Sequence, residues 1–156
     1  MKLRIKENVN MMDNDIYDKF CQVALLCHLG FQNLLYMHWN CVGSSFEEIH
    51  NLTQESSYML QSFCDRYMEL AMEGNISKIN PINAIDSFPD YNVQDKEQYN
   101  FKDVIEIITD IYTDIIESLT EIVNLPSITS DIKTGINSDI RRLTSEINYR
   151  NSAKLS

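Results

Sequence analysis

The sequence predicts an all-α protein, built as a bundle of four helices with one long crossover connection. The chain has 156 residues, enough for one domain with a substantial core and too few for two ordinary domains. It contains only 4 Gly and 3 Pro, fewer breakers than the many turns of an all-β sandwich require. Apolar residues recur at helical spacing in four separate stretches, which we take as the four helices.

The first half of the chain predicts a polar arm followed by two helices. Residues 1–12 are polar and are expected to be loose. A first helix over about 13–41 has an Asp or Asn at its start, which can cap it, and it ends before the breaker Gly43. A second helix over about 45–74 starts at a serine cap and ends at a Gly-Asn pair, a frequent C-terminal signal.

The second half predicts a long connection and two more helices. Residues 75–96 form the connection, and their pattern allows a short helical turn near 82–86. Connections of this length in a compact domain are usually crossovers, lids or functional segments. A third helix over about 97–124 and a fourth over about 127–148 follow. Two short-linked helix pairs joined by a long crossover have the connectivity of a ferritin-like bundle.

Three regions are therefore expected: a loose N-terminal arm over 1–12, the bundle over 13–149 and a frayed C-terminal tail over 150–156. The net charge is −10 and the isoelectric point is about 4.6. A polyanion is repelled by the phosphates of nucleic acids, so DNA is not an expected partner, although the arm carries three basic residues. An acidic surface is better suited to cations.

The cysteine pattern indicates a reducing compartment. Cys21, Cys27, Cys41 and Cys64 make no Cys-x-x-Cys pair and are expected to be buried, reduced thiols. No apolar run is expected to reach the roughly 18 residues of a transmembrane helix, and the N-terminus does not resemble a secretory signal. These features predict a cytoplasmic protein with no membrane contact.

Two histidines lie near the junction of the first two helices. His38 is at the end of the first helix beside Trp39, the single tryptophan, and His50 is one turn into the second helix. Gln54 follows His50 at i+4. Glu47-x-x-His50 matches half of a di-iron motif, but the third and fourth helices contain no histidine, so a di-iron site within one chain is not expected.

Two carboxylates lie further along the second helix. Asp65 and Glu69 are an i,i+4 pair on one face, and Gln54 shares that face. Gln54 and Asp65 are 11 residues apart, which is roughly 16 Å along a helix. One chain cannot easily close both ends on a single metal, but two copies related by a two-fold axis could, with His38 and His50 from one copy and Asp65 and Glu69 from the other.

The stretch HWNCVGSSFEEIH, from His38 to His50, closely resembles the signature of Dps-like mini-ferritins. That signature has His-Trp-Asn, a small or apolar pair, Gly, a Phe three residues on, and a second His twelve residues after the first. Asp65 and Glu69 fall where that family places two carboxylates supplied by the neighbouring subunit. The resemblance covers about 13–149, and it is specific through the second helix and weak in the last two.

The resemblance implies a hollow shell, typically of twelve subunits, that binds Fe(II) at two-fold interfaces. Such a protein would oxidise the iron, preferably with peroxide, and store ferric mineral inside. Imidazole and carboxylate are suitable ligands for Fe(II) and for some other divalent metals. The implied ligands are His38, His50, Asp65 and Glu69, with Gln54 as a compromised fifth, and Trp39 and Glu47 are expected near the site.

Gln54 is a departure from the family pattern, which has an acidic residue at that position. An amide oxygen can coordinate a metal but brings no charge and bridges poorly, so we expect one iron position to survive and a second to be weakened. Two functions therefore stay open. One is a ferroxidase and iron store; the other is a ferritin-like structural or interaction protein, for example a phage-encoded assembly component, whose metal chemistry has lapsed.

Overall fold

The computed structural model describes residues 11–74, 80, 82 and 84–154. Within these ranges the chain is helical, apart from connections and one isolated bridge. The all-α prediction is therefore confirmed. The helices are α1 (Met11–Trp39), α2 (Phe46–Met72), α3 (Ala84–Ser87), α4 (Phe101–Val123) and α5 (Ser130–Lys154).

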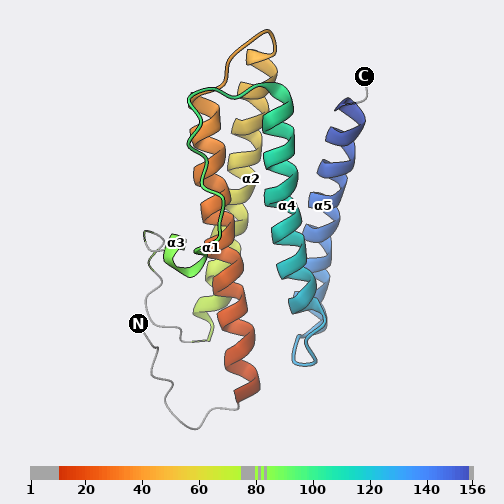
Figure 1. Cartoon of the computed structure of the whole chain (residues 1–156). Helices are drawn as coiled ribbons and strands as arrows, with labels where there is room; N and C mark the ends of the chain where they lie inside the picture. Colours follow the sequence, from red (N-terminus) through yellow and green to blue (C-terminus); the bar gives the residue numbers. More distant parts are fainter. Residues whose placement is uncertain (1–10, 75–79, 81, 83, 155–156) are drawn as a thin grey trace.

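The four long helices form two antiparallel pairs, α1 with α2 and α4 with α5 (Figure 1). The crossover carries the short α3 and then returns along the outside of the α1–α2 pair to the end where α1 meets α2 (Figure 1). This return lets α4 run parallel to α2. The structure thus confirms the ferritin-like connectivity that the long connection predicted.

Backbone hydrogen bonds join the end of the crossover to the connection between α1 and α2. The backbone N–H of Tyr99 donates to the carbonyl of Asn40 (3.0 Å), and the N–H of Val42 donates to the carbonyl of Tyr99 (3.1 Å). Asn100 then caps α4, because its side chain accepts from the N–H of Asp103. Helix α4 therefore begins four residues later than the expected start at about 97. The same contacts hold the junction that carries both candidate histidines in place.

Helix α1 is the centre of the core. At Gly30 an added Cβ would lie 2.8 Å from side-chain atoms of both Leu60 in α2 and Ile111 in α4. Only a residue without a side chain allows the three helices to approach this closely. The core that results is apolar and fully buried, and its largest members include Phe20, Leu34, Met37, Ile49, Leu60, Ile105, Ile108, Ile115 and Leu119.

A buried polar cluster attaches α5 to α2. The carboxylate of Asp139, 5% exposed, accepts a hydrogen bond from the Tyr67 hydroxyl (2.6 Å) and pairs with the guanidinium of Arg66. Burial is the largest cause of the raised pKa of Tyr67, so this hydroxyl keeps its proton and donates it. A buried carboxylate needs such partners to offset its lost hydration.

The helices at the two ends of the chain do not have the expected bounds. Of the arm expected over 1–12, residues 1–10 are outside it, and α1 begins at Met11. Helix α5 continues to Lys154, past the expected boundary at 149. The reason is Arg150, which is buried and donates to the hydroxyl of Ser56 in α2, so the last turns stay in contact with the bundle.

Two expectations about apolar and sulfur-containing residues need correction. Among the described residues, Ile16–Trp39 is long and apolar enough to cross a membrane by length and composition alone, although 61% of its most apolar window is buried in the bundle. All four cysteines are free, but only Cys27 and Cys41 are fully buried. Burial raises the pKa of each thiol, which keeps them protonated and poorly reactive.

Candidate metal site

The structure brings His38 and His50 into direct contact. His38 lies in the last turn of α1 and His50 in the second turn of α2. Gly43, at φ 101°, takes the left-handed conformation that the tight connection between these helices requires. The two imidazole rings stack with their centroids 3.7 Å apart and their planes inclined by 26°.

Hydrogen bonds fix the tautomer of His38. Its Nδ1 lies 2.9 Å from the carbonyl oxygen of His50 and 3.2 Å from Oγ1 of Thr53. The Thr53 hydroxyl directs its own proton at the carbonyls of Ile49 and His50. A carbonyl oxygen can only accept, so Nδ1 carries the hydrogen, and the neutral ring presents its lone pair at Nε2. Histidines that bind metals are typically oriented by such a bond from the other ring nitrogen.

His50 is held by stacking rather than by hydrogen bonds. Its ring lies between that of His38 and that of Phe46, whose centroid is 5.3 Å away at an angle of 22°. Its Nδ1 is buried and makes no hydrogen bond within the described ranges. A buried ring nitrogen without a partner calls for an explanation, and a role in holding an ion is one of them.

The other residues expected at this end of the bundle differ in exposure. Gln54 is half-buried, and its side-chain N–H donates to the hydroxyl of Tyr58 (3.1 Å). This bond uses the amide nitrogen and leaves the carbonyl oxygen as the side chain's metal-binding atom. Trp39 is 70% exposed, and Glu47 is also exposed. Neither touches the two imidazoles through an interaction that the structure defines.

Asp65 and Glu69 are not brought to the histidines within one chain. His50 and Asp65 are 15 residues apart on the same straight helix, roughly 22 Å along its axis. Both carboxylates are exposed. In the described part of the chain no three His, Cys, Asp or Glu side chains converge on one point as metal ligands would. One copy therefore holds half of the expected ligand set at each end of α2.

Asp65 lines a groove of about 670 Å³ between α1 and α2, together with His28, Phe31 and Cys64. Burial lowers the pKa of His28, which favours its neutral form. His28 lies ten residues before His38 on α1, so the sequence pattern does not connect it with Asp65, and only the packing of α1 on α2 brings both residues to one groove. Thr53, which contacts His38, was not predicted either, although its position three residues after His50 is a usable signal.

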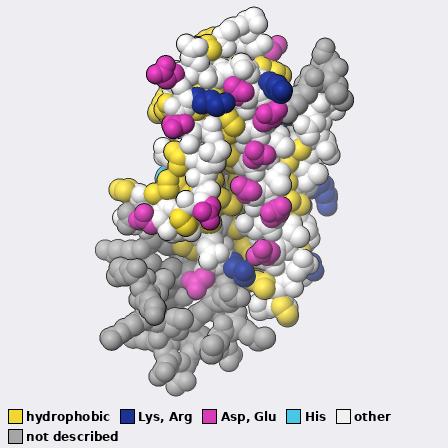
Figure 2. All heavy atoms as spheres, in the orientation of Figure 1, with side chains coloured by type: hydrophobic (Ala, Val, Ile, Leu, Met, Phe, Trp, Pro, Cys, Tyr) yellow, Lys and Arg dark blue, Asp and Glu magenta, His cyan; other side chains and the backbone are white. Residues whose placement is uncertain are grey.

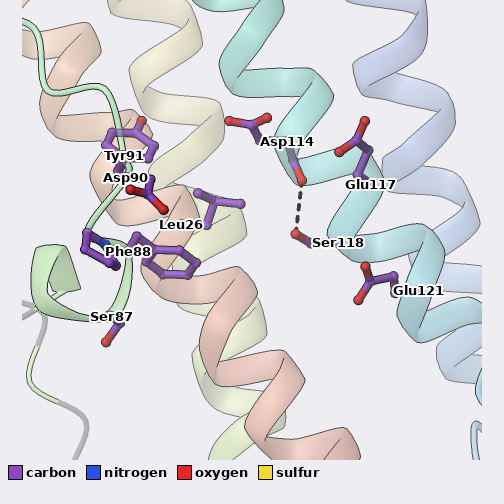
Figure 3. Close-up of a pocket in the computed structure, with 10 residues that line it drawn as sticks. Leu26, Ser87, Phe88, Asp90, Tyr91, Asp114, Glu117, Ser118 and Glu121 are labelled. Carbon is purple, nitrogen blue, oxygen red and sulfur yellow. Dashed lines mark hydrogen bonds between the residues drawn. The ribbon is translucent and has the colours of Figure 1, made fainter.

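A second acidic region lies away from the histidines. Figure 2 shows Asp and Glu side chains gathered along the face that α4 presents. Asp114, Glu117 and Glu121 line one side of a pocket of about 450 Å³, and the crossover residues Asp90 and Tyr91 line the other (Figure 3). The three carboxylates of α4 follow one helix instead of converging, and among the described residues no three His, Cys, Asp or Glu side chains gather here as metal ligands would.

Comparisons with known proteins agree with this architecture. No family model and no curated protein matches the sequence. Among solved structures, Helicobacter cinaedi CAIP matches with a TM-score of 0.80 at 16% identity, over 88% of this chain and 98% of that one. A Dps protein from Vibrio cholerae, described as one of the ferritin-like diiron-carboxylate proteins, matches with a TM-score of 0.80 at 16% identity, over 93% and 91%. Dps from Mycobacterium smegmatis matches with a TM-score of 0.81 at 14% identity, over 97% of this chain and 92% of that one.

The fold is therefore a ferritin-like four-helix bundle. Within that class it is the Dps-like mini-ferritin fold, as the signature from His38 to His50 predicted. At these identities the likeness concerns the fold alone.

Proposed function

We propose that this protein binds Fe(II) at sites shared by two copies of the chain, oxidises it with peroxide and stores the ferric product in a hollow homo-oligomeric shell of twelve subunits. The observation that carries the proposal is the histidine pair. His38 has its Nδ1–H bound to a carbonyl and its Nε2 open, and it is stacked on His50, which has an unpartnered ring nitrogen.

The shared site follows from what one chain lacks. His38 and His50 form a prepared nitrogen half, and Asp65 and Glu69 supply exposed carboxylates too far along α2 to reach it. An antiparallel second copy, related by a two-fold axis, would place its Asp65 and Glu69 against the histidines of the first. Two nitrogen and two carboxylate ligands suit Fe(II), and other divalent metals would compete for them.

The chain's own groups have limited roles in the reaction. The histidines orient the metal substrate, and the carboxylates offset its charge. In the balanced reaction, two Fe(II) ions, one H₂O₂ and two protons give two Fe(III) ions and two water molecules. Gln54 contributes no charge, so we propose one strong and one weakened iron position. Trp39 and Glu47 lie close enough in sequence to border the assembled site. The proposal places the protein in the cytoplasm, with neither DNA nor a membrane as a partner.

The test is peroxide-dependent Fe(II) oxidation, followed by ferric absorbance after anaerobic loading. His38→Ala and Asp65→Ala should each abolish it. Co-assembly of the two variants at equal amounts should restore about a quarter of the sites, because half of the dimers are mixed and each has one intact site. Full activity in both single variants would refute the proposal, and absence of rescue in mixed oligomers would refute the shared site.

A second function is favoured by Gln54: a ferritin-like structural or interaction protein that keeps the assembly without the metal chemistry. It predicts an oligomer whose melting temperature does not respond to Fe(II), Zn(II) or Mn(II). Any ligand that binds only the folded state must raise the melting temperature. A metal-dependent shift in the wild-type protein that disappears in His38→Ala would exclude this alternative.

A further inference from the structure

Tyr58 lies on α2 between the two halves of the candidate metal site. It follows Gln54 by one turn, and Asp65 lies two turns further on. These three positions, together with those of His50 and Glu69, fall within about 100° of one another around the helix. Tyr58 therefore belongs to the face of α2 that carries all the candidate ligands of this helix.

The side chain of Tyr58 is accessible and is linked to a candidate ligand. It is 60% exposed, and it borders the groove of about 670 Å³ that Asp65 also lines. Its hydroxyl oxygen accepts a hydrogen bond from the side-chain amide of Gln54 (3.1 Å). Tyr67 and Tyr112, by contrast, are buried in the bundle. A reaction at a metal beside Gln54 would therefore reach the Tyr58 phenol through one hydrogen bond.

The two-fold assembly proposed above would place Tyr58 close to the symmetry axis. When His50 of one copy meets Asp65 or Glu69 of the other, the axis crosses α2 midway between those positions, at about 57–60. Tyr58 lies within about 2 Å of that level along the helix. The Tyr58 side chains of the two copies would then face each other between the two metal sites, each about 12 Å along α2 from its own His50.

Peroxide reduction at this site requires an electron donor besides one iron. Reduction of one H₂O₂ to water takes two electrons, and one Fe(II) supplies only one. Because Gln54 brings no charge, the second iron position is weakened, and a site that holds a single Fe(II) lacks the second electron. A phenol can donate one electron, and it releases with that electron one of the protons that the formation of water consumes.

We propose that Tyr58 is a redox-active residue that supplies the second electron when only the strong iron position is filled. One Fe(II), one H₂O₂, one Tyr58 phenol and one proton give one Fe(III), one Tyr58 phenoxyl radical and two water molecules. This role rests on the proposed function, to which it adds a second electron donor.

The radicals of the two copies meet at the axis and combine there. A carbon–carbon bond forms between the two rings, and the hydrogen on each bonded carbon moves as a proton to the phenolic oxygen of the same ring. No further oxidant is needed for this step. The product is a dityrosine cross-link between the two copies, so Tyr58 is also a site of covalent modification.

The experiment adds a limiting amount of H₂O₂ to anaerobic protein that holds one Fe(II) per site. We expect about one Fe(II) oxidised per peroxide, a tyrosyl radical in the electron paramagnetic resonance spectrum of rapidly frozen samples, and covalent dimers on a denaturing gel. Tyr58→Phe should remove the radical and the dimers and raise the ratio toward two Fe(II) per peroxide. Tyr149→Phe is the matched control, because Tyr149 is 77% exposed on α5 and does not line the groove; it should behave like the wild type.

A second measurement tests the position of Tyr58 without iron. Metal-free oligomer is treated with a photochemical one-electron oxidant, and the cross-linked peptide is identified by mass spectrometry. We expect a link between the Tyr58 residues of two copies, in the wild type and in Tyr149→Phe but not in Tyr58→Phe.

Three results would overturn the proposal. Persistence of the tyrosyl radical and of the covalent dimers in Tyr58→Phe would assign the radical to another residue. Oxidation of two Fe(II) per peroxide by the wild type, without a radical, would leave the phenol no role. Absence of the photochemical cross-link in the oligomer would show that the two Tyr58 side chains lie apart. The second result leaves Fe(II) oxidation intact, so it is distinct from failure of the proposed function, in which the protein oxidises no more Fe(II) than a protein-free solution.

Discussion

At the N-terminal end of α2, His50 is stacked between His38 and Phe46, and a hydrogen bond fixes which ring nitrogen of His38 is open. Further along the same helix, Asp65 and Glu69 are exposed, and no comparable contact with another described residue holds them. The histidine half is therefore organised by folding alone, because α1, α2 and the crossover meet there. Under the proposed function a second copy would complete the carboxylate half, and metal binding would then depend on assembly.

The largest expected effect separates these two halves by stability. His38→Ala and Asp65→Ala should both reduce peroxide-dependent Fe(II) oxidation by at least about 100-fold, since each removes a ligand. Their metal-free melting temperatures should differ. His38→Ala breaks a stack and two hydrogen-bond contacts and should lower the melting temperature. Asp65→Ala changes an exposed side chain, so its free energy of unfolding should stay within about 0.5 kcal/mol of the wild-type value and its melting temperature should barely change. Equal destabilisation, measured by differential scanning calorimetry, would contradict the contrast.

A gain of function should come from Gln54→Glu. The change keeps the shape of the side chain and adds the carboxylate that the metal would otherwise lack, so Fe(II) affinity should rise by about tenfold. Anaerobic Fe(II) titration measures it. Gln22→Glu, at an exposed position on α1, adds the same charge elsewhere and should leave affinity unchanged. An equal gain in both variants would attribute the effect to overall charge.

A smaller loss is expected from Thr53→Val. The substitution nearly preserves volume but removes the hydroxyl beside Nδ1 of His38. The carbonyl of His50 remains as an acceptor, so Fe(II) affinity should fall by only a few-fold, toward the lower end of the roughly 10–100-fold range for partners of metal ligands. A loss of Fe(II) affinity as large as that caused by His38→Ala would mean that Thr53 does more than orient the imidazole ring of His38. Circular dichroism checks that the helices are intact.

The smallest expected effect lies on the acidic face of α4. Burial, then the charges of Glu117 and Asp110, raise the pKa of Asp114 above its ordinary 3.8. The folded state therefore binds this proton more tightly than the unfolded state, and stability is lost as the pH rises from the unfolded value through the folded one. Asp114→Asn should raise the melting temperature slightly at pH 7 and have no effect below the unfolded pKa. A decrease at pH 7 would contradict the assigned repulsion.

Much of this architecture could be predicted from spacing. Apolar periodicity located the four long helices, and the length of the 75–96 connection predicted the crossover. The four-residue error at the start of α4 arises because Asn100 caps the helix while Tyr99 is paired with Asn40. The missed extension of α5 has a similar cause, since the polar tail composition does not reveal that Arg150 is buried against Ser56.

The sequence by itself determined the helical class, the pairing of helices and the position of His38 twelve residues before His50, because periodicity and short linkers are local properties. Only the tertiary structure decided that the two rings stack, that Nε2 of His38 is the open nitrogen, and that Arg150 is buried against Ser56. These features depend on side chains from helices far apart in the chain. Their directions are fixed by packing, which no single segment encodes.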